Sequence, residues 1–484
     1  STQAKTLFPY TTLFRSGESY ESAGAKLSKE KQGFAYFKEV AIGAVSGVAI
    51  LALIIGGFSL TGGTPAPTQT QAQPTASGSA TPSPTASNAR TCSVKDLAAD
   101  PLLGSLQAIV MNNTTDEILF DRGGSTPGAT ASTMKVITAA AALVTLGPNY
   151  RVDTRVYSDP ANPGVIYLVG GGDVTLSRLA PGQQSVYKDA AKLSSLASQV
   201  ISKLAGTNIS QIVLDSSMFG GPSWESSWER SEQTQGYMSE VTALQVDGDR
   251  DNAQQETSKR STTPVKRAGG WFKKALGPIA ASASIVEGKT PGTATEVAKV
   301  SSAPISTWIT HMLQVSDNTQ AEALARLVSL DLGYDGSFGS INSAFKQALT
   351  PLGIDMTGLV IKDGSGLSNN NAVPPIYFAK LFKLVLAGGN DLSWIMQGLP
   401  VAAESGSLAD RFKGDNVDAA GKIKAKTGWI KKGYTLAGTI DAKDGTKLTF
   451  AIYALGQVSD ASKQAIDNLA TGFYRCGNQL SNEQ

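Results

Sequence analysis

The stretch Gly128-Ala129-Thr130-Ala131-Ser132-Thr133-Met134-Lys135 runs directly into Val136-Ile137-Thr138-Ala139-Ala140-Ala141-Ala142-Leu143, a helix-forming tract that ends at Gly147-Pro148. Ser132 and Lys135 are three residues apart, so on a helix they lie on one face, about one turn from each other. A serine at a helix N-terminus with an amine one turn away can be a nucleophile with its own base. Burial near other cations would lower the pKa of Lys135 enough for its amine to take the serine proton. The stretch therefore predicts a nucleophile, Ser132, activated by Lys135.

The spacing by itself does not identify a site. A serine and a lysine on the surface of any helix produce it, and it occurs three more times, at Ser28/Lys31, Ser185/Lys188 and Ser343/Lys346. None of these copies has the small-residue approach and the alanine-rich helix that surround Ser132. The assignment of Ser132 depends on partners elsewhere in the chain.

Length and composition bound the possible functions. The chain has 484 residues, enough for two or three domains, and a net charge of +2, which gives no argument for nucleic acid as a partner. It has one histidine, His311, and two cysteines. No zinc site of ordinary spacing can be assembled from that set, so we expect no metal and no other cofactor. His311 is interpreted as a core or surface residue rather than a member of a catalytic triad.

The first 91 residues predict a membrane anchor. Residues 6–16 resemble a translated sequencing adapter and are excluded from fold reasoning. Residues 40–60 form an apolar stretch long enough to span a bilayer, with a buried core helix as the alternative. Lysines precede this stretch, while none follows it before Arg90, so residues 1–39 are expected in the cytoplasm. Residues 61–91, rich in Thr and Pro, are expected to form a disordered stalk that carries an extracellular domain.

Two cysteines flank the remaining chain. Cys92 opens it and Cys476 lies close to its end. In an oxidising exterior we expect them to form one disulfide that ties both ends together, with two free buried thiols as the alternative.

The patterning between them predicts an α+β fold. Residues 106–122 read as a hairpin, while 434–441 and 448–454 read as strands before a closing helix at 461–474. One antiparallel sheet that shares both chain ends and is flanked by helices would explain this order. The intervening residues 155–295 read as a mixed α/β block, with a helix at 185–204 and an exposed loop at 249–266. A Thr-x-x-Glu sequence, Thr319 to Glu322, has the form of a capping box that opens a helix.

Two further motifs follow Ser132 and Lys135 in chain order. Ser316-x-Asn318 falls in a joint between two helices, and Lys426-Thr427-Gly428 occurs once. The ordered set is the signature of serine penicillin-recognising enzymes. With the stretches LVGGGDVTL and KDGSGLS, the chain closely resembles the D-alanyl-D-alanine carboxypeptidase/endopeptidase family of low-molecular-mass penicillin-binding proteins. The resemblance implies a β-lactamase/transpeptidase-like catalytic domain, residues 92–154 and 296–484, with a smaller inserted α/β domain, residues 155–295.

The resemblance also implies roles for the motif residues. Ser132 would attack the carbonyl of a D-Ala-D-Ala peptide bond of a peptidoglycan stem peptide, with Lys135 as base. Ser316 and Asn318 would complete the proton path and hold the substrate amide. Lys426 and Thr427 would attract the terminal carboxylate. Further implied features are a close substrate approach at Gly428, an oxyanion hole made by the backbone N–H groups of Ser132 and Trp429, and inhibition by β-lactams.

One residue departs from the family pattern. Trp429 stands where many relatives carry a Thr or Ser whose hydroxyl helps to hold the carboxylate. By position, Trp228 and Tyr237 could edge the pocket for the stem-peptide side chain. Two other functions remain open. One is a β-lactamase, although the chain lacks the Glu-x-x-Leu-Asn motif that would argue for it. The other is a non-enzymatic wall-binding protein, although such a protein would be expected to have a broken catalytic set.

Overall fold

The structure of the chain is a computed structural model that describes residues 90–483. The predicted cytoplasmic tail, the predicted membrane span at 40–60 and all but the last two residues of the predicted stalk lie outside these residues. Within 90–483, no helix combines the length and the apolar character that crossing a bilayer requires.

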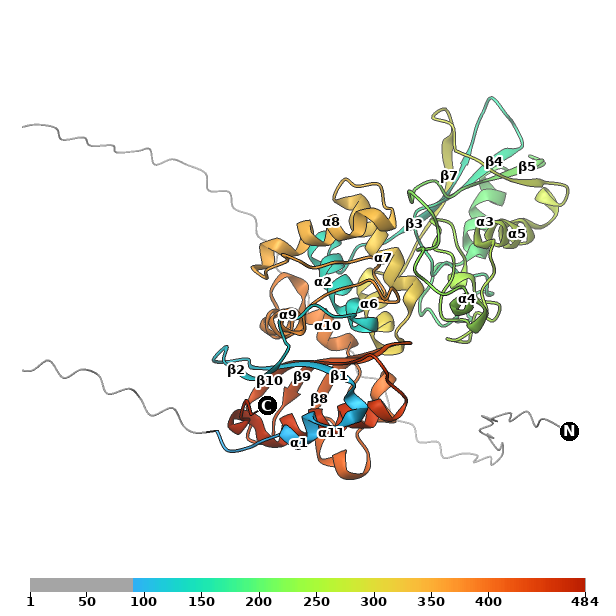
Figure 1. Cartoon of the computed structure of the whole chain (residues 1–484). Helices are drawn as coiled ribbons and strands as arrows, with labels where there is room; N and C mark the ends of the chain where they lie inside the picture. Colours follow the sequence, from blue (N-terminus) through green and yellow to red (C-terminus); the bar gives the residue numbers. More distant parts are fainter. Residues whose placement is uncertain (1–89, 484) are drawn as a thin grey trace, which may run out of the picture. The chain divides into compact units, whose positions relative to one another are not determined.

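A five-stranded antiparallel sheet joins the two ends of the described chain (Figure 1). β1 (Ser105–Asn112) turns back as β2 (Ile118–Arg122) and pairs on its other side with β10 (Lys447–Leu455). β9 (Gly433–Asp441) and β8 (Ile423–Ile430) complete the order β2-β1-β10-β9-β8. The predicted antiparallel sheet with strands from both chain ends is therefore confirmed, and β8 lies at its edge.

Helices cover both faces of this sheet (Figure 1). α1 (Lys95–Ala98) and α11 (Ala461–Cys476) pack on one face, where the rings of Phe120 and Phe473 lie 5.3 Å apart. α9 (Pro375–Ala387) packs against β10 on the other face. Because successive side chains of a strand point to opposite faces, central strands covered on both sides are apolar nearly throughout.

A disulfide joins Cys92 to Cys476, at the end of α11, with their Cα atoms 5.4 Å apart. The two cysteines are 384 positions apart in the sequence, so the bond ties the start of the described chain to its last helix.

The helical layer above the sheet is built around α2 (Met134–Leu146). Its alanines, residues 139–142, are fully buried, and side chains this small allow neighbouring helices to pack closely. α2 contacts α7 (Asn318–Asp331) and α8 (Phe338–Leu349). The layer also contains α6 (Ile305–Val315) and α10 (Ser393–Gly398).

A second five-stranded sheet has the order β6-β5-β4-β3-β7. β3 is antiparallel to β4 and β7, whereas β4, β5 and β6 run parallel. The elements of this part are β3 (Asp153–Ser158), β4 (Val165–Gly170), α3 (Leu193–Lys203), β5 (Gln211–Asp215), α4 (Ser231–Gln235), α5 (Pro264–Leu276), β6 (Ser284–Glu287) and β7 (Thr295–Ser301). The inserted block was expected to begin at residue 155, which lies within β3.

Two expectations for the inserted block are wrong. The helix expected at 185–204 begins only at Leu193, because Asp189 adopts a left-handed backbone (φ 55°) and Lys192 an extended one. The loop expected to be exposed at 249–266 contains the buried Arg250 and Arg260, and α5 begins within it. The buried guanidinium of Arg250 has partners far away in the sequence, Tyr187 and Asp317.

The expected capping box is also wrong. The N-cap of α7 is Asp317, whose carboxylate accepts the backbone N–H of Gln320 at 2.9 Å. Glu322 is instead buried and accepts the backbone N–H groups of Gly364 and Ser365, at 2.9 and 2.7 Å. A cap made by Asp at this position satisfies a donor that the first turn of the helix leaves free.

Candidate active site

Ser132 lies in a short 3₁₀ turn, Ala131–Thr133, that leads into α2. Ala131 before it has a positive φ of 45°, which is strained for a residue with a side chain. The carbonyl of Ala131 would lie 1.8 Å from a Cβ at Gly366, so only glycine fits in the facing turn. Ser132 lines a cavity of about 760 Å³ together with residues from all three motifs.

The side chain of Lys135 is fully buried and has three hydrogen-bond partners. Its Nζ lies 2.9 Å from Ser132 Oγ, 2.7 Å from Asn318 Oδ1 and 2.8 Å from the carbonyl oxygen of Ser365. The amide and carbonyl oxygens can only accept a hydrogen bond, whereas a hydroxyl can also donate one. A neutral Lys135 amine can therefore donate to both oxygens and point its lone pair at the hydroxyl of Ser132.

Burial lowers the pKa of Lys135 to about 8, against the opposing effect of the Glu322, Asp363 and Asp317 carboxylates. Burial, which we expected together with nearby cations, is therefore the main cause. Burial and then the charge of Lys135 lower the pKa of Lys426 well below its usual value. An amine with a pKa near 8 is close to the range in which a general base works best at neutral pH.

Hydrogen bonds to Asp363 hold the turn that carries the Ser365 carbonyl. Asp363 accepts hydrogen bonds from the backbone of Gly366 and Ser368, from the Asn371 amide and from the indole of Trp228. Burial and the adjacent Asp363 raise the pKa of Glu322 to about 8. The KDGSGLS stretch thus positions one of the two oxygens that hold Lys135.

The joint between α6 and α7 brings the second motif to Lys135. Ser316 adopts a left-handed conformation (φ 65°), and this turn separates the two helices. Its Oγ accepts a hydrogen bond from Lys426 Nζ at 2.9 Å. Asn318 accepts from Lys135 and donates from Nδ2 to the carbonyl of Tyr237 at 3.0 Å. The second N–H of its amide is left over for a ligand.

The third motif lies on the edge strand β8. The side chain of Lys426 is buried, while Thr427, Gly428 and Trp429 line the cavity. A Cβ at Gly428 would lie 2.2 Å from Thr435 Oγ1 and 2.8 Å from the backbone N of Ser132. The glycine is therefore needed for β8 to pack against the Ser132 turn, in addition to the substrate approach that we predicted.

Ser407 is a site residue that the sequence did not indicate. Its Oγ lies 2.7 Å from Thr427 Oγ1, and both residues line the cavity. A second hydroxyl thus stands beside Thr427, although Trp429 has none. A short 3₁₀ segment, Gly406–Leu408, places it there, and no spacing relative to Lys426 announces this contact.

The two predicted pocket-edge residues have different outcomes. Tyr237 is half exposed and lines the cavity. Trp228 is buried in the core between Trp224 and Phe338, and its indole N–H donates to Asp363 at 2.8 Å. The prediction for Trp228 is therefore wrong: an indole surrounded by other rings supports the Asp363 turn from inside.

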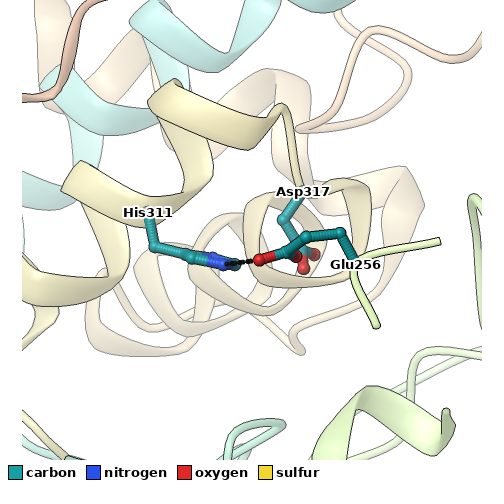
Figure 2. Close-up of side chains that lie close together, drawn as sticks. All are labelled: Glu256, His311 and Asp317. Atoms are coloured by element: carbon teal, nitrogen blue, oxygen red, sulfur yellow. Dashed lines mark hydrogen bonds and ion pairs between the residues drawn. The ribbon is translucent and has the colours of Figure 1, made fainter. Parts of the chain in front are cut away.

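Next to the cavity, Glu256, His311 and Asp317 converge, with one potential ligand atom from each within 4.8 Å of the others (Figure 2). His311 Nε2 lies 3.0 Å from Glu256 Oε1. The guanidinium of Arg250, however, lies 2.7 Å from Asp317 Oδ2 and 3.7 Å from Glu256 Oε2. The charged Arg250 already contacts two of these three residues, Asp317 and Glu256. Its positive charge would repel a divalent metal ion and so disfavours metal binding here.

The chain matches one protein family and is similar to several known proteins. The model of the D-Ala-D-Ala carboxypeptidase 3 (S13) family matches residues 91–260 and 249–474. A carboxypeptidase of Mycobacterium tuberculosis is 34% identical over 410 residues, which cover 84% of this chain and 87% of the relative. The carboxypeptidase DacB of Mycolicibacterium smegmatis is 33% identical over 383 residues, 78% of this chain and 82% of the relative. Penicillin-binding protein 4 of Haemophilus influenzae has a similar fold, with a TM-score of 0.67 and 22% identity over 80% of this chain and 99% of its own.

Proposed function

The chain belongs to the D-Ala-D-Ala carboxypeptidase 3 (S13) family, and from this premise we propose that it cleaves D-Ala-D-Ala bonds of peptidoglycan stem peptides through an acyl-enzyme on Ser132. The observation that carries the proposal is the buried contact between Lys135 Nζ and Ser132 Oγ at 2.9 Å. It supplies a nucleophile and a base of suitable pKa in one site.

Acylation begins when Ser132 Oγ attacks the carbonyl carbon of the penultimate D-Ala and its proton moves to the neutral amine of Lys135. Negative charge develops on the substrate oxygen, which the backbone N–H groups of Ser132 and Trp429 would stabilise. The C–N bond then breaks, and the leaving amine of the terminal D-Ala takes a proton through Lys135 and Ser316. Water later hydrolyses the ester by the reverse proton path, which regenerates Ser132.

The opposite wall of the cavity would bind the terminal carboxylate. Lys426 would supply positive charge, because a carboxylate bound beside it favours the charged form of the amine against the effect of burial, and the hydroxyls of Thr427 and Ser407 lie side by side as donors. Residues 400–402 pair with the first half of β8, and beyond Ala425 its edge would let the peptide add as a further strand, while Asn318 holds its amide. The same geometry would accept the D-Ala bond of a cross-link, so endopeptidase activity belongs to the proposal.

We propose that the enzyme works at the cell membrane, outside the cytoplasm. The proposal rests on the apolar residues 40–60 and on the lysines that precede them. A catalytic domain tied by a disulfide suits an oxidising exterior.

β-Lactams should acylate the same serine, because their amide mimics the scissile bond. Penicillin-binding protein 4 of Haemophilus influenzae has been crystallised with a β-lactam, which supports this extension.

The test uses a fluorescent penicillin and a D-Ala-D-Ala stem peptide with the full chain. We expect covalent labelling and release of D-Ala, and Ser132→Ala should abolish both. Labelling that persists in Ser132→Ala would refute the nucleophile. Rapid turnover of nitrocefin would favour a β-lactamase, and a folded chain that neither labels nor releases D-Ala would favour a wall-binding protein.

A further inference from the structure

Asp317, between the two active residues of the second motif, is buried and charged. Its Oδ1 accepts the backbone N–H of Gln320, while its Oδ2 meets Arg250 Nη2 at 2.7 Å and the Tyr187 hydroxyl at 3.1 Å. Burial alone would raise the pKa of Asp317, but Arg250 and then His311 hold it well below its usual range. Asp317 therefore remains a carboxylate that needs a counter-charge.

That counter-charge comes from the inserted block. Arg250, only 2% exposed, follows a short 3₁₀ turn, Asp247–Asp249, that lies far from Asp317 in the sequence. Its Nη1 donates to the Tyr187 hydroxyl at 2.5 Å, and its Nε lies 3.2 Å from the carbonyl oxygens of Gln255 and Glu256. A planar guanidinium can make all these contacts at once, whereas a lysine cannot.

Three further titratable groups, Glu256, His311 and Arg260, surround the pair; Glu256 attracts Arg250, whereas Arg260 repels it. Glu256 lies within 3.7 Å of Arg250 and bonds to His311, which is stacked edge-on against Tyr187. Arg260, also buried, is close enough for Arg250 to lower its pKa. The inserted block thus places several polar side chains around a single residue of the catalytic part, Asp317.

We propose that Arg250 is a positioning residue for catalysis: by clamping Asp317 it fixes the strained turn at Ser316 and the start of α7, and so aims Ser316 and Asn318 at the two lysines. The inference rests on the proposed function and deepens it. Ser316 and Asn318 sit immediately on either side of Asp317, so a rotation of this joint would break both the Lys426–Ser316 and the Lys135–Asn318 hydrogen bonds. The clamp makes the inserted block necessary for the chemistry.

The first measurement is the rate of penicillin acylation of Arg250→Met in the full chain. We expect the acylation rate constant to fall about 10- to 100-fold with little change in the initial binding constant, because misplaced groups lose alignment rather than contact area. Arg250→Lys should recover only part of the rate. A rate for Arg250→Met within about twofold of the wild type would overturn the proposal.

A double variant separates positioning from charge neutralisation. Arg250→Met leaves Asp317 buried and unpaired, which should lower the melting temperature. Arg250→Met/Asp317→Asn removes both charges and keeps a good helix cap. We expect it to regain melting temperature but not the acylation rate. Recovery of both would show that Arg250 only neutralises a charge, and the proposal would fail.

Two further variants complete the design. Arg155→Met is the matched control, because Arg155 also lies in the inserted block and pairs with two carboxylates, Asp153 and Glu296, but not with Asp317; it should keep the wild-type rate. Tyr187→Phe removes two hydrogen bonds of the clamp, the one from Arg250 and the one to Asp317, without changing charge, and a several-fold slower rate is expected. If the Arg250 variants do not fold, an unchanged rate in Tyr187→Phe decides against the clamp. Loss of labelling in Ser132→Ala alone tests the proposed function, so the two failures are distinguishable.

Discussion

The two walls of the cavity differ in their exposure to water. On one wall, Lys135 is fully buried and each of its three contacts is a hydrogen bond to protein. On the other, Lys426 is also buried, but Ser407 is exposed and Trp429 is 53% exposed. Proton transfer needs a shifted pKa, which only burial supplies here. Capture of a carboxylate needs an open approach for a charged ligand. Under the proposed function, the cavity would place proton transfer on its buried wall and carboxylate recognition on its more exposed wall.

The largest effect expected is on the buried wall. Lys135→Met should lower the acylation rate about 10²- to 10⁴-fold, because the variant keeps a buried side chain but loses the base. Stopped-flow measurement with a fluorescent penicillin would give the rate. The control is Lys346→Met, which alters the Ser343-x-x-Lys346 copy on α8. An equal loss in both variants would mean that Lys135 has no special role.

The next largest effect is expected in the pH dependence of the acylation rate. Lys135 must be neutral to accept the proton, and its pKa is about 8. The acylation rate should therefore rise about tenfold per pH unit below pH 8 and level off above it. In Asp317→Asn this rise should move to lower pH, because the Asp317 carboxylate raises the pKa of Lys135. A flat profile between pH 6 and about 8 would contradict Lys135 as the base.

A smaller effect is expected on the exposed wall. Ser407→Ala should lower kcat/KM about tenfold for peptides with a free terminal carboxylate, as expected for one lost hydrogen bond to a charged group. Peptides with an amidated end should be affected less. Ser405→Ala, two residues away, is the control. Adding Trp429→Thr to Ser407→Ala should restore much of the lost kcat/KM, since it returns a hydroxyl to this wall. If the double variant is no better than Ser407→Ala, the carboxylate binds elsewhere.

The residues of the site also differed in how well the sequence predicted them. The pair Ser132/Lys135 and the Lys426-Thr427-Gly428 strand could be named from the sequence because, with Ser316-x-Asn318, they form an ordered set that resembles a known family; the Ser-x-x-Lys spacing alone occurs three more times. Ser407 could not, because its contact with Thr427 depends on how a loop folds over β8. Trp228 was misplaced since an aromatic residue in a polar stretch can face either a pocket or the core. Thr319 and Glu322 matched a capping box, yet Glu322 found better partners across the fold in Gly364 and Ser365.

The sequence alone predicted the nucleophile and its base and the antiparallel sheet that shares both chain ends, and it showed the order of the three motifs. The sheet was predicted from strand and turn patterns at both ends of the globular part, and the nucleophile from the ordered motifs and the family resemblance that they carry. The tertiary structure decided the rest: the burial that lowers the pKa of Lys135, the hydroxyl of Ser407 and the contact between Arg250 and Asp317. Each of these depends on segments that are distant in sequence and meet only when the core packs, so no local pattern specifies them.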